Sequence, residues 1–160
     1  MSHEELLEYL QQEKDRLFQY ASYRLPETCD AEDALQDLYI ALTTKIGQIN
    51  HADPKPYMYR ALSNICTTRL RNKKYHLPID GIDVTAETEN FDEEFRLINS
   101  LLSKLPEEQS ETIRLHLHCE LTFAEVAEIM EVPAATVKSR YRYGIDHIRK
   151  ELKKMNYFNK

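Results

Sequence analysis

The chain of 160 residues carries 21 Lys and Arg against 27 Asp and Glu, a formal net charge of −6 at pH 7, and only 3 Gly. This length and a composition rich in Leu, Glu, Ala and Lys predict one ordinary domain or two small helical ones, and no apolar run approaches the roughly 20 residues that span a bilayer. The polar N-terminus is unlike a signal peptide, and three cysteines without a Cys-x-x-Cys pair argue against a disulfide framework, so we expect a cytoplasmic protein without membrane insertion.

Charge is distributed unevenly along the chain. Residues 54–79 contain six Lys or Arg and no acid, whereas residues 75–95 contain seven acids and no Lys or Arg; the chain becomes basic again after Thr136. Salt screens charges beyond about 8–10 Å, so local patches rather than the total govern contacts. The net negative charge therefore does not exclude nucleic acid as a partner.

Apolar residues at helical spacing predict three helices in the first half of the chain, over residues 4–24, 30–45 and about 56–74. Asp30 is a good N-cap for the second helix, and Pro56 can sit in the first turn of the third. Three such helices can share one core.

The outer face of the second predicted helix is acidic and bears one amide. It carries Glu32, Asp33, Gln36 and Asp37. One helix face cannot hold two carboxylates apart across a concave catalytic site. A solvated face is the ordinary interpretation, and docking of basic residues of a protein partner is the alternative.

The third predicted helix combines aromatic, polar and basic side chains. Aromatic rings can stack on unpaired bases, while Asn, Thr and Arg can contact base edges and phosphates. A core role for Tyr57 with a solvated remainder is equally compatible with the pattern. The candidate residues are Tyr57, Tyr59, Arg60, Asn64, Thr67, Thr68 and Arg71.

Residues 76–90 contain acids, Pro78 and Gly81 without helical periodicity, which predicts a flexible, self-repelling linker. Helical spacing resumes at Phe95, and Pro106 opens a further helix that ends near Glu120. The expected fold is all-α: two small helical domains, residues 1–75 and 95–160, joined by an acidic linker over 76–94.

The last part of the chain has the pattern of a helix-turn-helix. Thr122 and Glu125 form a capping box before a short helix, residues 131–133 form a turn, and a longer basic helix follows. An amphipathic hairpin with a solvated basic side is the alternative. The expected inward residues of the longer helix are Val137, Tyr141, Ile145, Ile148 and Leu152. Its expected DNA-facing residues include Ala134, Ala135, Lys138, Ser139 and Arg142.

Three potential metal ligands, His116, His118 and Cys119, lie close together in the sequence. Nothing nearby supplies further ligands. The chain also has no nucleophile-elbow pattern and no Gly-rich phosphate loop. We therefore expect no catalytic site, no metal and no cofactor.

Several segments follow a fixed order along the chain, beginning with DAEDALQD at residues 30–37 and YMYRALSN at residues 57–64. The first resembles the D-A-E-D-x-x-Q-[DE] segment of bacterial sigma factors, and the second resembles their W-L-Y-R-x-x-x-N promoter-melting helix. Residues 105–109, 121–129 and 136–140 resemble the C-terminal promoter-binding domain. The short chain leaves no room for other sigma domains, which indicates the extracytoplasmic-function (ECF) group.

This resemblance implies a role for each segment. Residues 1–75 would form a region 2-like domain whose acidic face docks on the β′ clamp of core RNA polymerase. Its third helix would hold the melted minus-ten element, and the loop near 50–55 would receive a flipped-out base. The acidic linker would occupy polymerase channels, and residues 95–160 would form a region 4-like domain near the β flap. An anti-sigma partner is common in the group. The implied minus-35 contacts are Ala135, Thr136, Lys138, Ser139, Arg140 and Arg142.

The chain departs from the family pattern at several of these positions. Tyr57 stands where Trp is usual, and Glu131 and Ala135 stand where Gly is frequent. If Glu131 adopts a left-handed conformation, it carries a cost of about 1 kcal/mol. Tyr143 and Ile145 replace two usual Arg residues, which removes expected phosphate contacts.

Two other classes of protein remain as alternatives. A polymerase-independent helix-turn-helix regulator would bind duplex DNA alone, although the order of the motifs and the acidic helix face count against it. A helical enzyme or metal protein would depend on His116, His118 and Cys119.

Overall fold

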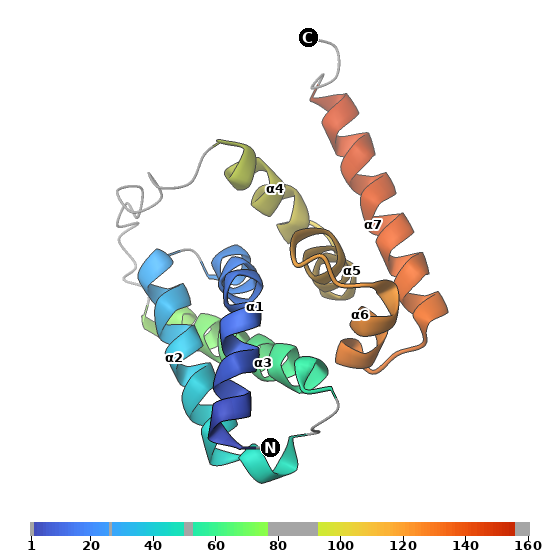
Figure 1. Cartoon of the computed structure of the whole chain (residues 1–160). Coiled ribbons are helices and arrows are strands. Elements are labelled where there is room, and N and C mark those ends of the chain that lie inside the picture. Colours follow the sequence, from blue (N-terminus) through green and yellow to red (C-terminus); the bar gives the residue numbers. More distant parts are fainter. Residues whose placement is uncertain (1, 26, 50–52, 77–92, 156–160) are drawn as a thin grey trace. The chain divides into compact units, whose positions relative to one another are not determined.

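The computed structural model describes residues 2–25, 27–49, 53–76 and 93–155 (Figure 1). The chain divides into two compact units, Met1–Glu89 and Asn90–Lys160, and every described element of both is a helix, which confirms the all-α expectation. Most of the predicted acidic linker, and residues 50–52 of the predicted base-binding loop, lie outside the described residues. No described helix is both long and apolar enough to cross a membrane.

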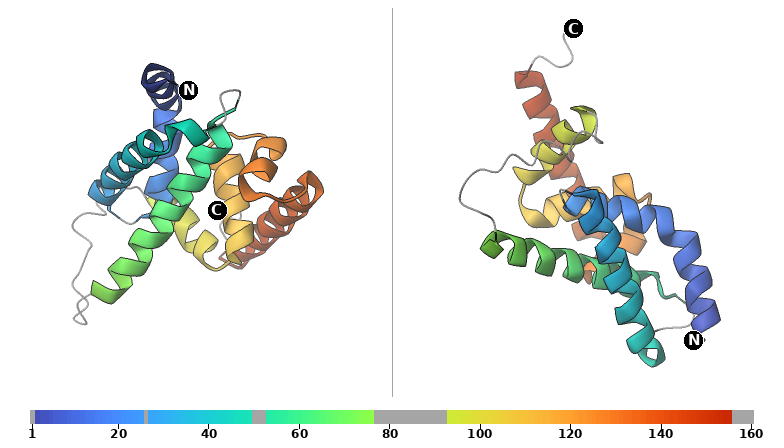
Figure 2. Two further views of the ribbon diagram at one scale, coloured as in Figure 1. Left: turned by 90° about the horizontal axis from the view of Figure 1, so that it is seen from below. Right: turned by 90° about the vertical axis from the view of Figure 1, so that its left-hand side faces the viewer.

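The first unit is built from three helices, α1 (His3–Arg24), α2 (Thr28–Thr44) and α3 (Lys55–His76), with a short 3-10 turn, η1 (Ile46–Gln48), after α2. Each helix packs against the other two, and α3 runs across the α1–α2 pair (Figure 2). The shared core contains Leu6, Leu17, Tyr20, Leu38, Leu42, Met58 and Leu62, all at most 1% exposed.

The start of α2 differs from the prediction. Glu27 is the N-cap and makes no side-chain capping bond, whereas the expected cap, Asp30, lies inside the first turn. A carboxylate in that turn is still favourable, because it meets the positive end of the helix dipole. The sequence pattern located the helix but placed its first residue two positions too late.

The second unit contains α4 (Glu93–Ser103), α5 (Glu107–Ile113), α6 (Phe123–Met130) and α7 (Ala134–Lys154). Helix α5 continues into a π-helical turn, η4 (Arg114–His118), so the single helix expected up to Glu120 changes its hydrogen-bonding pattern before it ends. Leu102, Leu105 and Ile113 form a core cluster, against which the predicted inward residues Tyr141, Ile145 and Ile148 of α7 pack.

Helices α5 and α7 approach closely at Gly144. A Cβ atom at this position would lie 2.6 Å from Ile113 Cδ1 and 3.5 Å from Gln109 Cβ. The buried glycine lets the Ile113 side chain fill the space between the two helices. The helix that carries the predicted DNA-facing residues is in this way held against the core of its unit.

Candidate nucleic-acid interface

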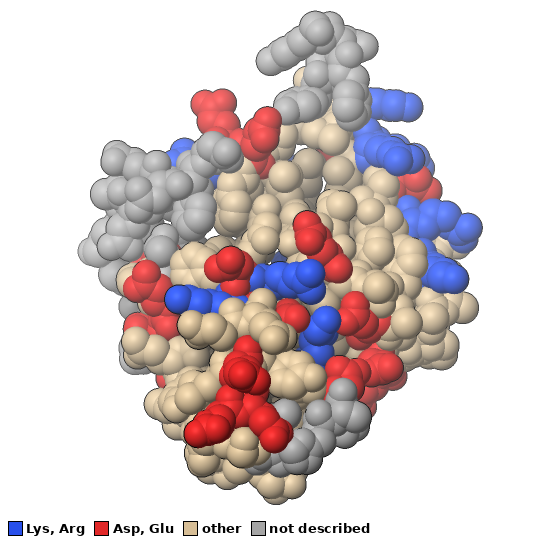
Figure 3. Space-filling view, viewed as in Figure 1, with Lys and Arg blue, Asp and Glu red and all other residues tan. Residues whose placement is uncertain are grey.

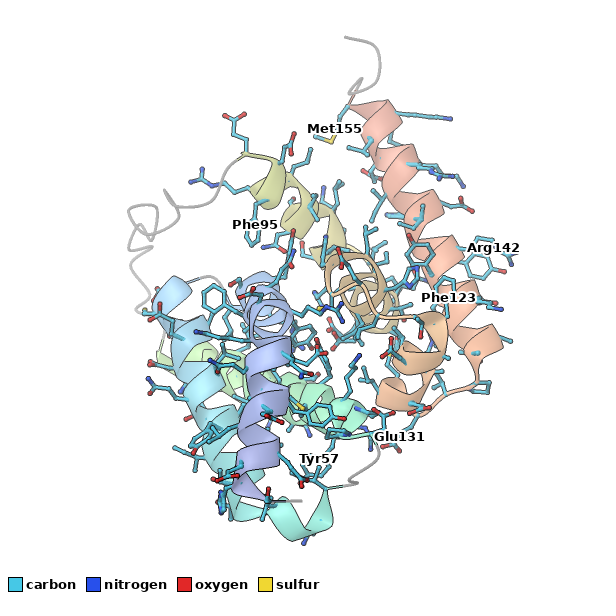
Figure 4. The ribbon with its side chains drawn as sticks, viewed as in Figure 1. Tyr57, Phe95, Phe123, Glu131, Arg142 and Met155 are labelled. Carbon is cyan, nitrogen blue, oxygen red and sulfur yellow. The ribbon has the colours of Figure 1, made fainter. Side chains whose placement is uncertain are left out.

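Helix α3 presents one exposed ridge of polar and basic residues. Tyr57, at the start of the helix, is half-buried (Figure 4). The other predicted minus-ten residues follow at spacings of three and four, or one apart, so they share one side of the helix. All five of these are exposed: Arg60, Asn64, Thr67, Thr68 and Arg71.

Tyr59 does not belong to this ridge, which corrects the expectation of two aromatic rings on the surface. The ring is fully buried and meets the Tyr20 ring edge-on, with centroids 6.4 Å apart. Its hydroxyl donates to Glu13 Oε2 at 3.0 Å, and Lys55 Nζ lies 3.5 Å from Glu13 Oε1. Tyr59 therefore anchors the start of α3 to α1.

Two arginines flank the ridge, one on each side. On the α2 side, Arg69 donates to Asp37 Oδ2 from Nη2 at 2.7 Å and from Nε at 3.1 Å. This hydrogen bond is the main cause of a raised Arg69 pKa. On the α1 side, Arg24 Nη2 donates to Thr67 Oγ1 at 2.9 Å. The sequence pattern did not single out either arginine as a partner of a predicted site residue.

The acidic face of α2 is divided by these contacts. Glu32, Asp33 and Gln36 are exposed on the helix, whereas Asp37 is half-buried and paired with Arg69. Asp37 also lines a cavity of about 710 Å³ together with Asn64, Thr68 and Arg69. Three of the four predicted docking residues therefore remain fully available on the surface, and Asp37 has a contact within its own unit.

An apolar groove lies between α1 and α2, beside the acidic face. Its volume is about 510 Å³, and Gln36 lines it together with Leu7, Tyr39 and Ile40. These three apolar side chains are 47%, 41% and 61% exposed. The sequence alone does not indicate this groove, because Leu7 fits the apolar stripe of the first helix, and such a stripe does not show which of its members a neighbouring helix covers.

Helices α6 and α7 form the predicted helix-turn-helix. The capping box is present: Glu125 N donates to Thr122 Oγ1 at 3.1 Å, and Thr122 N donates to Glu125 Oε1 at 3.0 Å. Glu131 closes α6 in the left-handed region, with φ 58° and ψ 46° (Figure 4). A residue with a Cβ atom pays a conformational penalty there of about 1 kcal/mol.

The outer side of α7 is basic, as a space-filling view shows (Figure 3). Ala135, Lys138 and Arg142 are exposed, and Arg142 points away from the helix (Figure 4). The guanidinium carbon of Arg142 lies 5.4 Å from the centroid of the exposed Tyr143 ring. The remaining predicted minus-35 residues, Thr136, Ser139 and Arg140, are half-buried.

The three potential metal ligands, His116, His118 and Cys119, lie among packed side chains of the second unit. His116 Nδ1 lies 2.8 Å from the Leu121 carbonyl oxygen, and its ring stacks on Phe123 with centroids 4.0 Å apart. Cys119 is buried. Burial and the neighbouring Arg114 lower the His118 pKa to about 4. Among the described residues, these three side chains do not bring their ligand atoms together.

Two family models match the chain in the order that the motifs indicated. Sigma-70 region 2 matches residues 10–75, and Sigma-70 region 4 matches residues 101–150. The ECF RNA polymerase sigma factor SigW of Bacillus subtilis (strain 168) is 27% identical over 158 residues, covering 88% of this chain and 84% of the relative. The ECF RNA polymerase sigma factor SigK of Mycolicibacterium vanbaalenii is 38% identical over 68 residues, 42% of this chain and 35% of the relative.

Solved structures of two other proteins share the fold. CnrH, in complex with the cytosolic domain of CnrY, is 20% identical with a TM-score of 0.72, covering 91% of this chain and 86% of CnrH. The sigma factor RpoE from Bartonella quintana, in complex with the anti-sigma factor NepR, is 17% identical with a TM-score of 0.68, covering 92% of this chain and 96% of RpoE.

The fold and its exposed surfaces define a class: a helical protein of two units with a polar, basic ridge on the first and a helix-turn-helix in the second. Together with the matches to both sigma regions and to SigW, they identify the family. The chain belongs to the sigma-70 family of RNA polymerase sigma factors, in its ECF group.

Proposed function

We propose that this sigma factor binds core RNA polymerase, directs it to a subset of promoters and helps to open the duplex there. One observation supports the proposal most directly: the chain has two separate exposed surfaces whose side chains can contact nucleic acid. One is the α3 ridge, and the other is the outer face of α7. Their order along the chain is that of sigma regions 2 and 4.

The α7 surface would hold the minus-35 element as duplex DNA. Small residues at its start, such as Ala135, let the helix approach base edges, while Lys138 and Arg142 supply charge for phosphates and guanine edges. This is the docking geometry of a helix-turn-helix, in which the second helix enters the major groove. Thr136, Ser139 and Arg140 would complete the contacts from the sides of the helix.

The α3 ridge would hold the minus-ten strand after the duplex has melted. Tyr57 would stack on an unpaired base, and Arg60, Asn64 and Arg71 would contact the strand along one side of the helix. Extruding a base from the stack costs a few kcal/mol. Stacking and polar contacts on the ridge offset part of this cost, so they favour the open state of the promoter.

The exposed acidic residues Glu32, Asp33 and Gln36 would dock on the β′ clamp, and the region 4 unit would lie near the β flap. Binding through two units joined by a linker raises the effective concentration of the second contact once the first has formed. Weak DNA binding by either unit alone is therefore compatible with promoter recognition by the complex.

The proposed role is recognition rather than catalysis, and it would be carried out in the cytoplasm, where core polymerase is present. An anti-sigma partner would control access to polymerase. This part of the proposal is supported by the likeness of the fold to that of RpoE, which was solved in complex with the anti-sigma factor NepR.

The test is a reconstitution with purified core polymerase. We expect the chain to co-elute with core polymerase. We also expect it to support initiation from promoters at which core polymerase alone does not initiate. Lys138→Ala with Arg142→Ala should weaken promoter binding and lower its salt dependence. The matched control is Arg149→Ala with Lys150→Ala, which removes the same charge from exposed positions further along α7.

A specific outcome would favour the alternative class. If the chain binds duplex DNA tightly and specifically by itself and does not associate with core polymerase, it acts as a polymerase-independent regulator. The charge variants then still report on the DNA surface, because they would weaken binding to DNA without any polymerase present.

A further inference from the structure

The cavity of about 710 Å³ between α2 and α3 shares residues with the predicted DNA-binding ridge. Asn64 and Thr68 belong to the ridge and also line this α2–α3 cavity, and Asn72 continues the same row one helical turn later. All three side chains are exposed. The α3 wall of the cavity is therefore accessible from the surface on which the melted strand is proposed to lie.

The α2 side of the cavity is acidic. Glu27, Asp30 and Asp37 line it, and Arg69 of α3 is the cation among the described lining residues. Oδ2 of Asp37 accepts both hydrogen bonds from Arg69. Carboxylates repel the phosphates of DNA and accept hydrogen bonds from N–H groups. The cavity therefore favours a neutral group with N–H donors over a stretch of phosphate backbone.

The polar side chains of the α3 wall have hydrogen-bonding capacity to spare. Within the part of the chain that the structure describes, no hydrogen bond engages the side chain of Asn64, Thr68 or Asn72. The neighbouring Thr67 differs, because its hydroxyl donates to the Ser63 carbonyl oxygen at 2.9 Å and it lies outside the cavity lining. Asn and Thr side chains can both donate and accept, so this wall can pair with the polar edge of a base.

The size and the apolar part of the lining also suit a base. Leu25, which is 2% exposed, and the half-buried Ile65 supply apolar surface for a planar ring. Small-ligand pockets commonly have volumes of about 300–1,000 Å³ and combine apolar lining with a few polar groups that fix orientation. The α2–α3 cavity has this combination beside a surface proposed to hold single-stranded DNA.

We propose that the α2–α3 cavity holds an unpaired base of the melted minus-ten strand, and that this base carries an exocyclic amino group. Adenine, cytosine and guanine can donate such a group to a carboxylate or an Asn side chain, whereas thymine has none. Thr68 lies eleven residues after Tyr57, about 16 Å along the helix axis at about 1.5 Å per residue. The base is therefore distinct from the one proposed to stack on Tyr57. This inference rests on the proposed function and adds a base-specific site to it.

The experiment measures the affinity of the reconstituted holoenzyme for fork-junction DNA. Its single-stranded minus-ten segment is selected by the wild-type holoenzyme from a random library, and each nucleotide of that segment is then replaced in turn by an abasic site. Loss of a base that is stacked or read by hydrogen bonds should weaken binding about fivefold or more. An abasic site keeps its phosphate, so a loss of affinity reports on the base alone.

Thr68→Val and Asn72→Ala identify the position that belongs to the cavity. Each should weaken binding to the intact DNA by about twofold to tenfold, the effect of one lost hydrogen bond. Each should have little further effect on the DNA that lacks the cavity base. Both side chains are exposed, so we expect both variants to fold, which circular dichroism checks.

Thr67→Val is the matched control for Thr68→Val, because it makes the same substitution one residue away and outside the cavity lining. It should keep its full dependence on every base of the segment. The proposal is overturned if no position couples to the Thr68 and Asn72 variants, or if Thr67→Val shows the same coupling.

The identity of the base is tested at the coupled position. Thymine there should weaken wild-type binding about as much as the abasic site does, because it cannot supply the amino group. Selection of thymine at this position, or equal affinity for thymine and the selected base, would overturn the assignment of an amino-bearing base.

A basic side chain of polymerase is the other occupant that an acidic cavity could hold. The Thr68 and Asn72 variants would then weaken association with core polymerase and couple to no base, which overturns the proposal. Arg60→Gln, elsewhere on the ridge, separates the two levels of the argument. If it weakens DNA binding and no base couples to the cavity variants, this inference fails and the proposed function stands. If the holoenzyme selects no fork-junction DNA, the proposed function itself fails.

Discussion

Asp37 on α2 and Arg69 on α3 form a hydrogen-bonded ion pair, with Arg69 Nη2 2.7 Å and Arg69 Nε 3.1 Å from the same carboxylate oxygen, Asp37 Oδ2. The two residues are 32 positions apart in the sequence, and both side chains are partly exposed. The pair links the helix proposed to dock on polymerase with the helix proposed to bind the melted strand. A substitution at Asp37 therefore changes both surfaces.

We predict that Asp37→Asn and Asp33→Asn have different effects on stability. Asp37→Asn removes an ion pair that is partly exposed, so it should lower the free energy of unfolding by about 0.5–1 kcal/mol. Asp33 is exposed on the same helix, and its neutralisation should leave stability within about 0.5 kcal/mol of the wild type. Urea unfolding followed by circular dichroism measures both values.

The same two variants test the docking proposal when they are titrated with core polymerase. A loss of affinity in Asp33→Asn, without a loss of stability, would be a direct effect on docking. If only Asp37→Asn loses affinity, the effect belongs to the contact between α2 and α3, and the docking surface must be sought elsewhere on the unit.

We predict that Glu131→Gly stabilises the region 4 unit by up to about 1 kcal/mol, because glycine adopts the left-handed conformation without the Cβ penalty. Glu131 has φ 58° at the end of α6. Thermal unfolding of the full chain should show a higher midpoint for the transition of this unit. Glu131→Ala is the control: it removes the carboxylate but keeps the Cβ atom, so a similar gain in both variants would assign the effect to charge.

Local signals in the sequence predicted much of the fold. The Thr122–Glu125 capping box depends on residues three apart, and the inward positions of α7 recur at helical spacing, so both could be read directly from the sequence. Tyr59 could not be placed correctly. Helix α3 packs against both α1 and α2, so its buried face is wider than the single apolar stripe that includes Met58 and Leu62.

The sequence predicted each candidate surface as a set of residues on one helix. It did not predict which residues of neighbouring helices contact that set. The contact between Arg24 and Thr67 joins residues 43 apart, and no periodicity in either helix indicates it. Such contacts depend on how three helices cross, which a single sequence does not specify. The consequences are chemical: Thr67 on the ridge accepts a hydrogen bond from Arg24 of α1, and the acidic face of α2 shares the Asp37 carboxylate with Arg69 of α3.

We predict that Thr122→Ala lowers the stability of the helix-turn-helix by about 1 kcal/mol, the usual loss when a capping side chain is removed. The Thr122 hydroxyl accepts from Glu125 N at 3.1 Å. Thr122→Ser keeps the oxygen and should retain most of the stability. Chemical unfolding of the three proteins provides the comparison, and equal losses in the Ala and Ser variants would show that the methyl group of Thr122 matters instead.

We predict that His118 makes the region 4 unit less stable as the solution becomes acidic. Burial, followed by the nearby Arg114, lowers its pKa from 6.5 to about 4 in the folded chain. Between these two values the unfolded chain binds a proton that the folded chain does not bind, so stability falls as the pH falls through this window. Below about 4 this contribution to the slope ends.

The His118 prediction is checked by measuring the free energy of unfolding of the wild type and of His118→Gln across that window. Gln does not titrate, so the variant should lose less stability than the wild type on acidification. Parallel curves for the two proteins would mean that other groups cause the pH dependence and that the lowered His118 pKa has little effect on folding.

We predict that the exposed Tyr143 ring strengthens minus-35 binding through Arg142. The Arg142 guanidinium carbon lies 5.4 Å from the centroid of the Tyr143 ring, a distance typical of cation–π pairs, which contribute about 0.5–1 kcal/mol at exposed sites. Tyr143→Leu removes the aromatic face and should weaken holoenzyme binding to minus-35 duplex DNA by about twofold to fivefold, the equivalent of that energy.

A second substitution separates the effect of the Tyr143 ring on DNA binding from the effect of its hydroxyl. Tyr143→Phe keeps the aromatic face and should bind like the wild type; if it weakens binding as much as Tyr143→Leu, the hydroxyl itself contacts DNA. A double-mutant cycle with Arg142→Ala tests the coupling, because Tyr143→Leu should have little further effect once the guanidinium is gone. Additive losses would show that Tyr143 and Arg142 act independently, and the aromatic residue that stands in place of the usual arginine would then contact DNA in its own right.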